Sequence, residues 1–148
     1  MPGYFDSAFV AKFYLDESDS EAVRDLATSL SRVSCLQLGR MEVAAAFHRK
    51  WREGSFSETA FGEISAQFAQ DCAQGLWNWL PLTSSLVDAA IARLVRLQKT
   101  VYLRSADALH LSCASEHGFR EMFSNDRHLG LAAPHFKLKV RGVAKLPY

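Results

Sequence analysis

The stretch "MPGYFDSAFVAKFYLDE", residues 1–17, places a carboxylate, Asp6, directly after a short apolar run. Residues 3–5 are typical of a buried strand, and residues 7–17 have a helical composition with apolar side chains on one face. A charge at the edge of a core is costly unless something pairs with it. This order of strand, acid and helix therefore predicts a partner for Asp6 elsewhere in the chain.

Helices and strands alternate along the rest of the sequence. Further strands are predicted at residues 32–38, 76–82, 121–124 and 136–140. Helices are predicted at residues 18–30, 39–53, 55–74, 84–99, 105–117 and 127–133. Two capping boxes, Ser18 with Glu21 and Ser55 with Glu58, mark predicted helix starts. The basic tail, residues 141–148, is predicted to be exposed.

Alternating strands and helices predict an α/β fold with a mostly parallel central sheet, because parallel strands need crossover connections. The chain of 148 residues has no internal repeat, linker or low-complexity tract, so one domain spanning residues 1–148 is expected. Apolar residues make up 49% of the chain and charged residues 22%, a composition that excludes a disordered or fibrous protein.

Four acids occupy equivalent places in this pattern. Asp6 and Asp126 follow strands, and Glu42 and Asp107 lie in the first turns of helices. Ligands bind at the carboxyl ends of strands in parallel sheets, where these acids are expected to meet. Each alone could be a helix cap or a macrodipole partner. Four converging carboxylates need protonation or bound cations, and an all-oxygen set favours Mg²⁺ or Mn²⁺. The implied chemistry is metal-assisted hydrolysis of a phosphodiester.

Four blocks of the sequence resemble the motifs of PIN-domain ribonucleases, particularly the toxin subunits of VapBC toxin–antitoxin pairs. The blocks are "YFDSAFVAKFYLDE" (4–17), "LGRMEVAAAFHRK" (38–50), "LRSADALHLSCA" (103–114) and "FSNDRHL" (123–129). They occur in the family's order and span nearly the whole chain. The resemblance implies a three-layer fold, with helices on both faces of the sheet and an acidic pocket that holds one or two Mg²⁺ or Mn²⁺ ions.

The resemblance also implies roles for single residues. The family's four acids map to Asp6, Glu42, Asp107 and Asp126, and its pocket hydroxyls map to Ser124 and Ser7. The family often has a serine where this chain has Ala8, which removes one hydrogen bond that could support a metal ligand. Such toxins cleave RNA, often tRNA or rRNA, and are inhibited by a small antitoxin protein. A homodimer is a further expectation from the family.

Several nearby residues have open interpretations. Three arginines, Arg40, Arg104 and Arg127, lie within three residues of a candidate acid and could contact RNA phosphates or an antitoxin. Ion pairs with the neighbouring acids are an equal alternative. His110 lies one helical turn after Asp107 and could bind a metal or relay a proton, but a local hydrogen bond in a partly buried position is the favoured interpretation.

Charge and cysteine content limit the other function classes. A net charge of +1 disfavours nucleic-acid binding through bulk charge, so any contact must use local patches. Three cysteines without CxxC spacing indicate free thiols in a reducing cytoplasm. No segment predicts secretion or membrane insertion. The leading hypothesis is a Mg²⁺-dependent endoribonuclease toxin; the alternatives are a non-catalytic PIN-like binding module and a nuclease acting on DNA or a flap.

Overall fold

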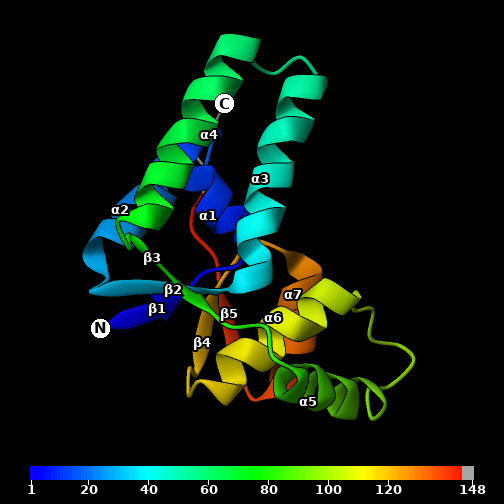
Figure 1. Cartoon of the computed structure of the whole chain (residues 1–148). Helices are drawn as coiled ribbons and strands as arrows, with labels where there is room; N and C mark the ends of the chain where they lie inside the picture. Colours follow the sequence, from blue (N-terminus) through cyan, green and yellow to red (C-terminus); the bar gives the residue numbers. More distant parts are fainter. Residues whose placement is uncertain (145–148) are drawn as a thin grey trace.

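A computed structural model, which describes residues 1–144, places short parallel strands at the centre of the protein (Figure 1). The strands are β1 (Pro2–Tyr4), β2 (Arg32–Leu36), β3 (Trp77–Leu80), β4 (Glu121–Phe123) and β5 (Lys139–Arg141). One sheet has the order β1-β2-β3 and a second pairs β4 with β5, all in parallel. A bridge between Phe5 and Phe123 joins β1 to β4, which brings the carboxyl ends of these two strands together.

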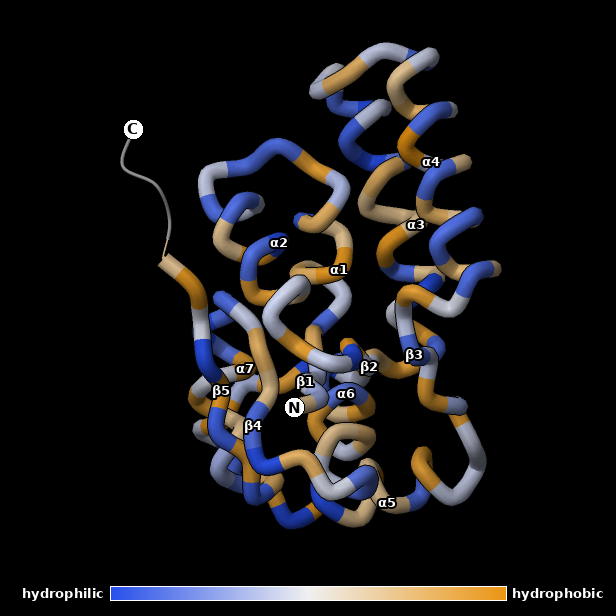
Figure 2. The backbone as a smooth tube through the Cα atoms, turned by 90° about the vertical axis from the view of Figure 1, so that its left-hand side faces the viewer, coloured by the Kyte–Doolittle hydropathy of each residue, from blue (hydrophilic) through white to orange (hydrophobic). Residues whose placement is uncertain are grey.

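Helices cover both faces of the strands (Figures 1 and 2). They are α1 (Ser7–Tyr14), α2 (Ser20–Ser29), α3 (Gln37–Arg52), α4 (Glu58–Ala73), α5 (Ser84–Leu94), α6 (Ser105–Glu116) and α7 (Arg127–Ala132), followed by a 3₁₀ helix (Ala133–Phe136). The antiparallel α3–α4 hairpin extends beyond the sheet as an arm (Figure 1). The predicted α/β fold with helices on both faces and parallel strands is confirmed.

The core consists of two apolar clusters, one on each face of the strands. Neighbouring side chains of a strand point to opposite faces, so Tyr4 packs with α5, α6 and α7 whereas Phe5 packs with α1 to α4. In the same way Leu36 belongs to the first cluster and Cys35 to the second. Along α3 and α4, hydrophobic and hydrophilic residues alternate with the helical period (Figure 2).

Neither predicted capping box starts its helix. The N-cap of α2 is Asp19, and the hydroxyl of Ser20 accepts a hydrogen bond from Glu17 N at 2.9 Å. The N-cap of α4 is Ser57, whose hydroxyl accepts a hydrogen bond from Ala60 N at 3.1 Å. In both segments the N-cap lies one or two positions after the predicted one; Asp19 is fixed there by contacts with Lys12 and Asn125, and Ser57 by its local hydrogen bond.

Several element ends also differ from the predictions. Helix α5 stops at Leu94 rather than residue 99, and the apolar residues Leu94 and Val95 at its end are exposed, so no neighbour stabilises further turns. The last strand begins at Lys139 rather than residue 136, because the 3₁₀ helix continues to Phe136 and Lys137 adopts a left-handed conformation with φ 60°. Residues 145–148 of the predicted exposed tail lie outside the described residues. No helix within residues 1–144 is long and apolar enough to cross a membrane.

Candidate active site

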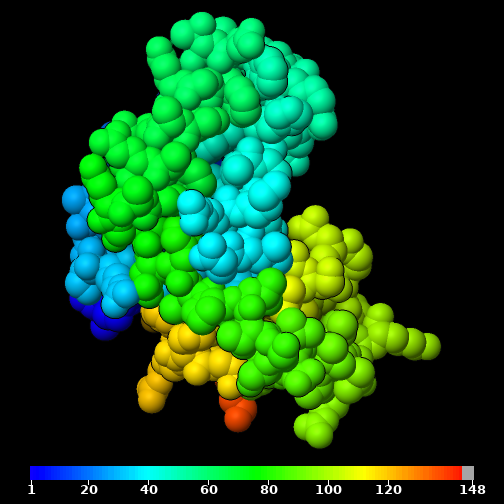
Figure 3. Space-filling model, in the orientation of Figure 1, coloured from blue at the N-terminus to red at the C-terminus, as the bar shows by residue number. Residues whose placement is uncertain are grey.

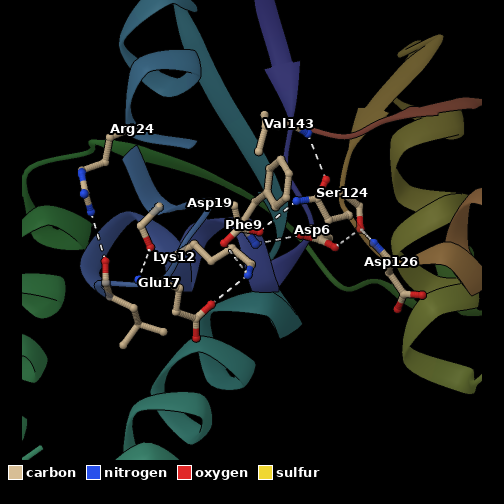
Figure 4. A network of polar contacts seen from close by, with 12 residues as sticks. Asp6, Phe9, Lys12, Glu17, Asp19, Arg24, Ser124, Asp126 and Val143 are labelled. Carbon is tan, nitrogen blue, oxygen red and sulfur yellow. Dashed lines mark hydrogen bonds and ion pairs between the residues drawn. The ribbon is translucent and has the colours of Figure 1, made fainter. Parts of the chain in front are cut away.

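Asp6 is buried where β1 meets α1 and is held by hydrogen bonds on both carboxylate oxygens (Figure 4). Its Oδ1 accepts from Phe9 N at 2.8 Å, which caps α1, and its Oδ2 accepts from the hydroxyl of Ser124. Burial raises the pKa of Asp6 to about 6, and the hydrogen bonds from Ser124 and Phe9 oppose that shift only in part. Within residues 1–144, Asp6 is therefore a buried carboxylate that forms no ion pair with a cationic side chain.

Ser124 connects Asp6 to the second strand-end acid, Asp126 (Figure 4). The Ser124 hydroxyl donates to Asp6 and accepts from Asp126 N at 2.9 Å. Asp126 is the N-cap of α7, where its Oδ1 accepts from His128 N at 2.8 Å. Because β4 lies beside β1, the loop after β4 delivers both Ser124 and Asp126 to the end of β1. The strand topology thus gathers Asp6, Ser124 and Asp126 at the sheet edge where parallel α/β folds bind their ligands.

Arg104 forms ion pairs with two of the four acids. Its Nε lies 3.1 Å from Asp107 Oδ2, and its Nη2 lies 3.9 Å from Asp126 Oδ2. The Arg104 side chain is 63% exposed, whereas that of Asp107 is 16% exposed. Asp107 and Asp126 come from different helices, so Arg104 acts as a shared counter-ion at the surface of the site. An exposed pair of this kind contributes little to stability, so the arginine can move away at small cost.

Glu42 is held by a chain of hydrogen bonds that begins in the core. Tyr4 OH accepts from Leu36 N at 3.1 Å and lies 2.9 Å from His110 Nδ1, and His110 Nε2 lies 2.6 Å from Glu42 Oε1. In the tautomer that satisfies every group, Tyr4 donates to Nδ1 and the Nε2–H of His110 donates to Glu42. His110 is buried, and its partners come from distant segments rather than from its own helix.

Gly39 allows α3 to approach α6 at this point. A Cβ atom at Gly39 would lie 2.5 Å from Cys35 Sγ and 3.3 Å from His110 Cε1. A methyl group therefore does not fit without displacing one of these neighbours. The close approach places Glu42, one turn further along α3, within reach of His110.

The remaining predicted residues lie in different environments. Ser7 lines the same groove, of about 850 Å³, as Glu42 and Arg104. Arg40 instead lines an apolar pocket beside α4, of about 540 Å³, which does not include any of the four acids. Arg127 is exposed at the first position of α7. The structure brings Arg104 to the acids and directs Arg40 away from them.

The four carboxylates fit a hard divalent cation in their donor chemistry, because all are oxygen ligands. Within residues 1–144, no three His, Cys, Asp or Glu side chains already converge in a ligand geometry. Each acid instead has a protein partner: Ser124 for Asp6, His110 for Glu42, and Arg104 for Asp107 and Asp126. A cation at this site would replace Arg104 as the neutralising charge.

A parallel α/β fold with acids at the ends of adjacent strands presents oxygen ligands at the edge of the sheet where such folds bind their ligands. The PIN domain family matches residues 4–133, and the chain belongs to this family. The resemblance predicted from the four sequence blocks is thereby confirmed. Among curated proteins the comparison found no match.

Three solved structures illustrate the proteins that share this fold. VapBC2 from Rickettsia felis, bound to a DNA fragment from its promoter, has a TM-score of 0.67 at 11% identity, covering 97% of this chain and 100% of that one. VapC20 of Mycobacterium tuberculosis, a sarcin-ricin-loop-cleaving toxin, has a TM-score of 0.69 at 16% identity, covering 89% and 95%. FitAcB from Neisseria gonorrhoeae has a TM-score of 0.70 at 16% identity, covering 95% and 96%. At these identities the likeness concerns the fold.

Proposed function

We propose that the protein is a Mg²⁺- or Mn²⁺-dependent endoribonuclease that acts as the toxin of a toxin–antitoxin pair. The observation that carries this proposal is the linked set of acids at one sheet edge, in which Asp6 is buried and forms no ion pair with any cation of the described part of the chain. Membership of the PIN domain family supports a nuclease, and nucleases of this family generally use a divalent metal.

The four acids would hold the metal, and the chain's other residues would prepare them for it. A bound divalent ion lowers the pKa of a coordinated water and stabilises charge on the reacting phosphate. Ser124 fixes the orientation of Asp6, and His110 fixes that of Glu42. When Arg104 is released from Asp107 and Asp126, its exposed guanidinium is free to contact a phosphate of the substrate.

The partners follow from the same proposal. RNA is the substrate, with tRNA or rRNA as the expected class, and a small antitoxin protein is the inhibitor. The structural neighbours support the antitoxin, because a toxin–antitoxin complex from Klebsiella pneumoniae shares the fold with a TM-score of 0.58. A homodimer is part of the proposal, and sedimentation of the purified protein tests it.

The test is cleavage of end-labelled tRNA and rRNA by purified protein, with Mg²⁺ or Mn²⁺ against EDTA. Asp107→Asn is expected to abolish metal-dependent products while retaining the fold, because it removes a ligand from a partly exposed position. Asp88→Asn is the matched control, since Asp88 is an exposed acid on α5, outside the site. Full cleavage by Asp107→Asn would exclude the assignment. The absence of both cleavage and metal-induced stabilisation in the unmodified protein would favour the non-catalytic binding module instead.

A further inference from the structure

A groove runs from the candidate active site along one side of α3. Ser7, Glu42 and Arg104 line its inner end, and His48, Arg49 and Arg52 line its outer part. Figure 3 shows a hollow in the surface between helix α3, in cyan, and the yellow segment that leads into α6. The groove therefore begins at Glu42 and at Arg104, the ion-pair partner of Asp107 and Asp126, and leads away from the candidate active site along α3.

We propose that this groove binds a single-stranded segment of RNA next to the phosphate that is cleaved. The inference rests on the proposed function and adds the path of the substrate and the residues that hold it. His48, Arg49 and Arg52 are the phosphate-binding residues, and Arg104 lies where the strand enters the site.

The exposed basic side chains of the groove are available to bind a polyanion. His48, Arg49 and Arg52 are all exposed on α3, and spacings of three and four residues place them on one side of the helix. Arg49 has a single weak ion pair, 3.9 Å from Glu53, with both side chains more than half exposed. Within residues 1–144, Arg52 makes no ion pair. The two arginines are therefore not consumed in holding the fold together, whereas His48 packs against Trp51 and Phe61.

The shape of the groove also suits a nucleic-acid backbone. Between Glu42 and the arginines its wall is formed by Ala44, Ala45 and Ala46, whose small side chains permit close approach. Ten residues of α3 separate Glu42 from Arg52, a rise of about 15 Å, long enough for a short run of extended nucleotides. Regularly placed cations along an open track position a strand without reading its sequence.

An acidic protein segment is the rival occupant, but the location of the groove favours RNA. A substrate must reach the acids. The groove leads from Glu42, one of these acids, to Arg49 and Arg52 of α3. The net charge of the chain is only +1, so binding depends on this local arrangement rather than on general attraction.

The experiment measures binding of a labelled single-stranded RNA by fluorescence anisotropy in EDTA, at several salt concentrations. The double variant Arg49→Ala/Arg52→Ala is expected to bind about tenfold more weakly, with a salt slope smaller by about 1.4 for two lost phosphate contacts. Arg96→Ala is the matched control, because this exposed arginine follows α5, far from the α3–α4 arm (Figure 1). Thermal unfolding checks that all variants fold.

The outcomes separate the two proposals. An unchanged affinity and salt slope in the double variant would overturn the groove assignment, even if the protein cleaves RNA. Groove-dependent binding without cleavage and without metal-induced stabilisation in any divalent ion would overturn the nuclease and leave the RNA path standing. If the double variant lost binding to a poly-glutamate peptide but kept RNA binding, the groove would belong to an acidic protein partner.

Discussion

Asp6 and Asp19 are both buried carboxylates at helix N-caps, yet their surroundings differ in one respect. Asp19 lies 2.9 Å from Lys12 Nζ and accepts from Asn125 Nδ2 at 2.8 Å (Figure 4). The donors to Asp6 among residues 1–144 are neutral, namely the backbone N–H of Phe9 and the hydroxyl of Ser124. Although burial raises the pKa of Asp19, the hydrogen bonds from Lys12 and Asn125 lower it overall. The pKa of Asp6 is raised to about 6, with burial as the main cause.

The same short segment serves both acids. Ser124 donates to Asp6, and the adjacent Asn125 donates to Asp19. Asp19 thus completes an ion pair that ties α1 and α2 to the loop after β4. Asp6 keeps an unneutralised charge at the sheet edge. The comparison teaches that two buried acids in the same part of the fold can differ in whether a protein cation neutralises them, and this difference makes Asp6 the better candidate for binding a ligand.

The largest expected difference between the two acids is in catalysis. Asp6→Asn removes a proposed metal ligand and should lower kcat/KM for RNA cleavage by about three orders of magnitude, comparable to the loss of a main electrostatic group in other enzymes. Asp19→Asn should retain activity within about threefold at a temperature where it is folded. Initial rates on the same labelled RNA provide the measurement. Equal losses in both variants would remove the distinction between the acids.

The support of Glu42 should appear in metal affinity. Tyr4→Phe removes the hydroxyl that orients His110, and His110→Ala removes the donor to Glu42. Loss of a residue that supports a metal ligand typically lowers affinity by about 10- to 100-fold, and the smaller end is expected for Tyr4→Phe. Calorimetric titration with Mn²⁺ measures this without requiring turnover. His117→Ala, on the exposed end of α6, is the control. Unchanged Mn²⁺ affinity in His110→Ala would show that Glu42 needs no such support.

The smallest expected effect is on the free energy of unfolding, and it should have opposite signs in Asp19→Asn and Asp6→Asn. The lowered pKa of Asp19 gives stability that is present above about pH 4 and is lost as the pH falls through its folded pKa. Asp19→Asn should therefore destabilise the protein by about 2 kcal/mol at neutral pH, with the gap closing in acid.

Asp6 should behave in the reverse manner. Its raised pKa destabilises the folded protein. This destabilisation is absent below about pH 4 and complete above about pH 6. Asp6→Asn should thus stabilise the metal-free protein by about 1 kcal/mol at neutral pH and have no effect in acid. Urea unfolding in EDTA at pH 4, 5, 6 and 7 measures both variants. Destabilisation by Asp6→Asn at pH 7 would contradict the unpaired state of this acid.

The fold and the order of the four acids were accessible from sequence because both depend on local patterns. Asp6 and Asp126 follow apolar runs and Asp107 lies in the first turn of α6, so their places are visible within short windows. The predicted first-turn position of Glu42 is wrong, because α3 begins at Gln37 rather than at residue 39 and Glu42 lies in its second turn. The partners of these acids were not accessible in the same way. His110 is 68 positions from Glu42, and Tyr4 is 106 positions from His110. Only the sheet order brings them together.

Asp19 was missed for a different reason. It lies in "SDSE", residues 18–21, where Ser18 and Glu21 predict a capping box, and an acid inside such a motif is ordinarily exposed. Its burial depends on Lys12 and Asn125, neither of which is unusual in its own segment. The spacing of Arg104 and Asp107 does indicate their ion pair, but the second contact of Arg104, with Asp126, requires the fold.

Gly39 has a consequence for how freely this sequence can diverge. At Gly39 even a single added carbon would contact Cys35 and His110 too closely. A change there would shift the whole helix and so move Glu42 and the arginines of the groove together. Gly39 therefore constrains the position of Glu42 and of the groove arginines on the same helix.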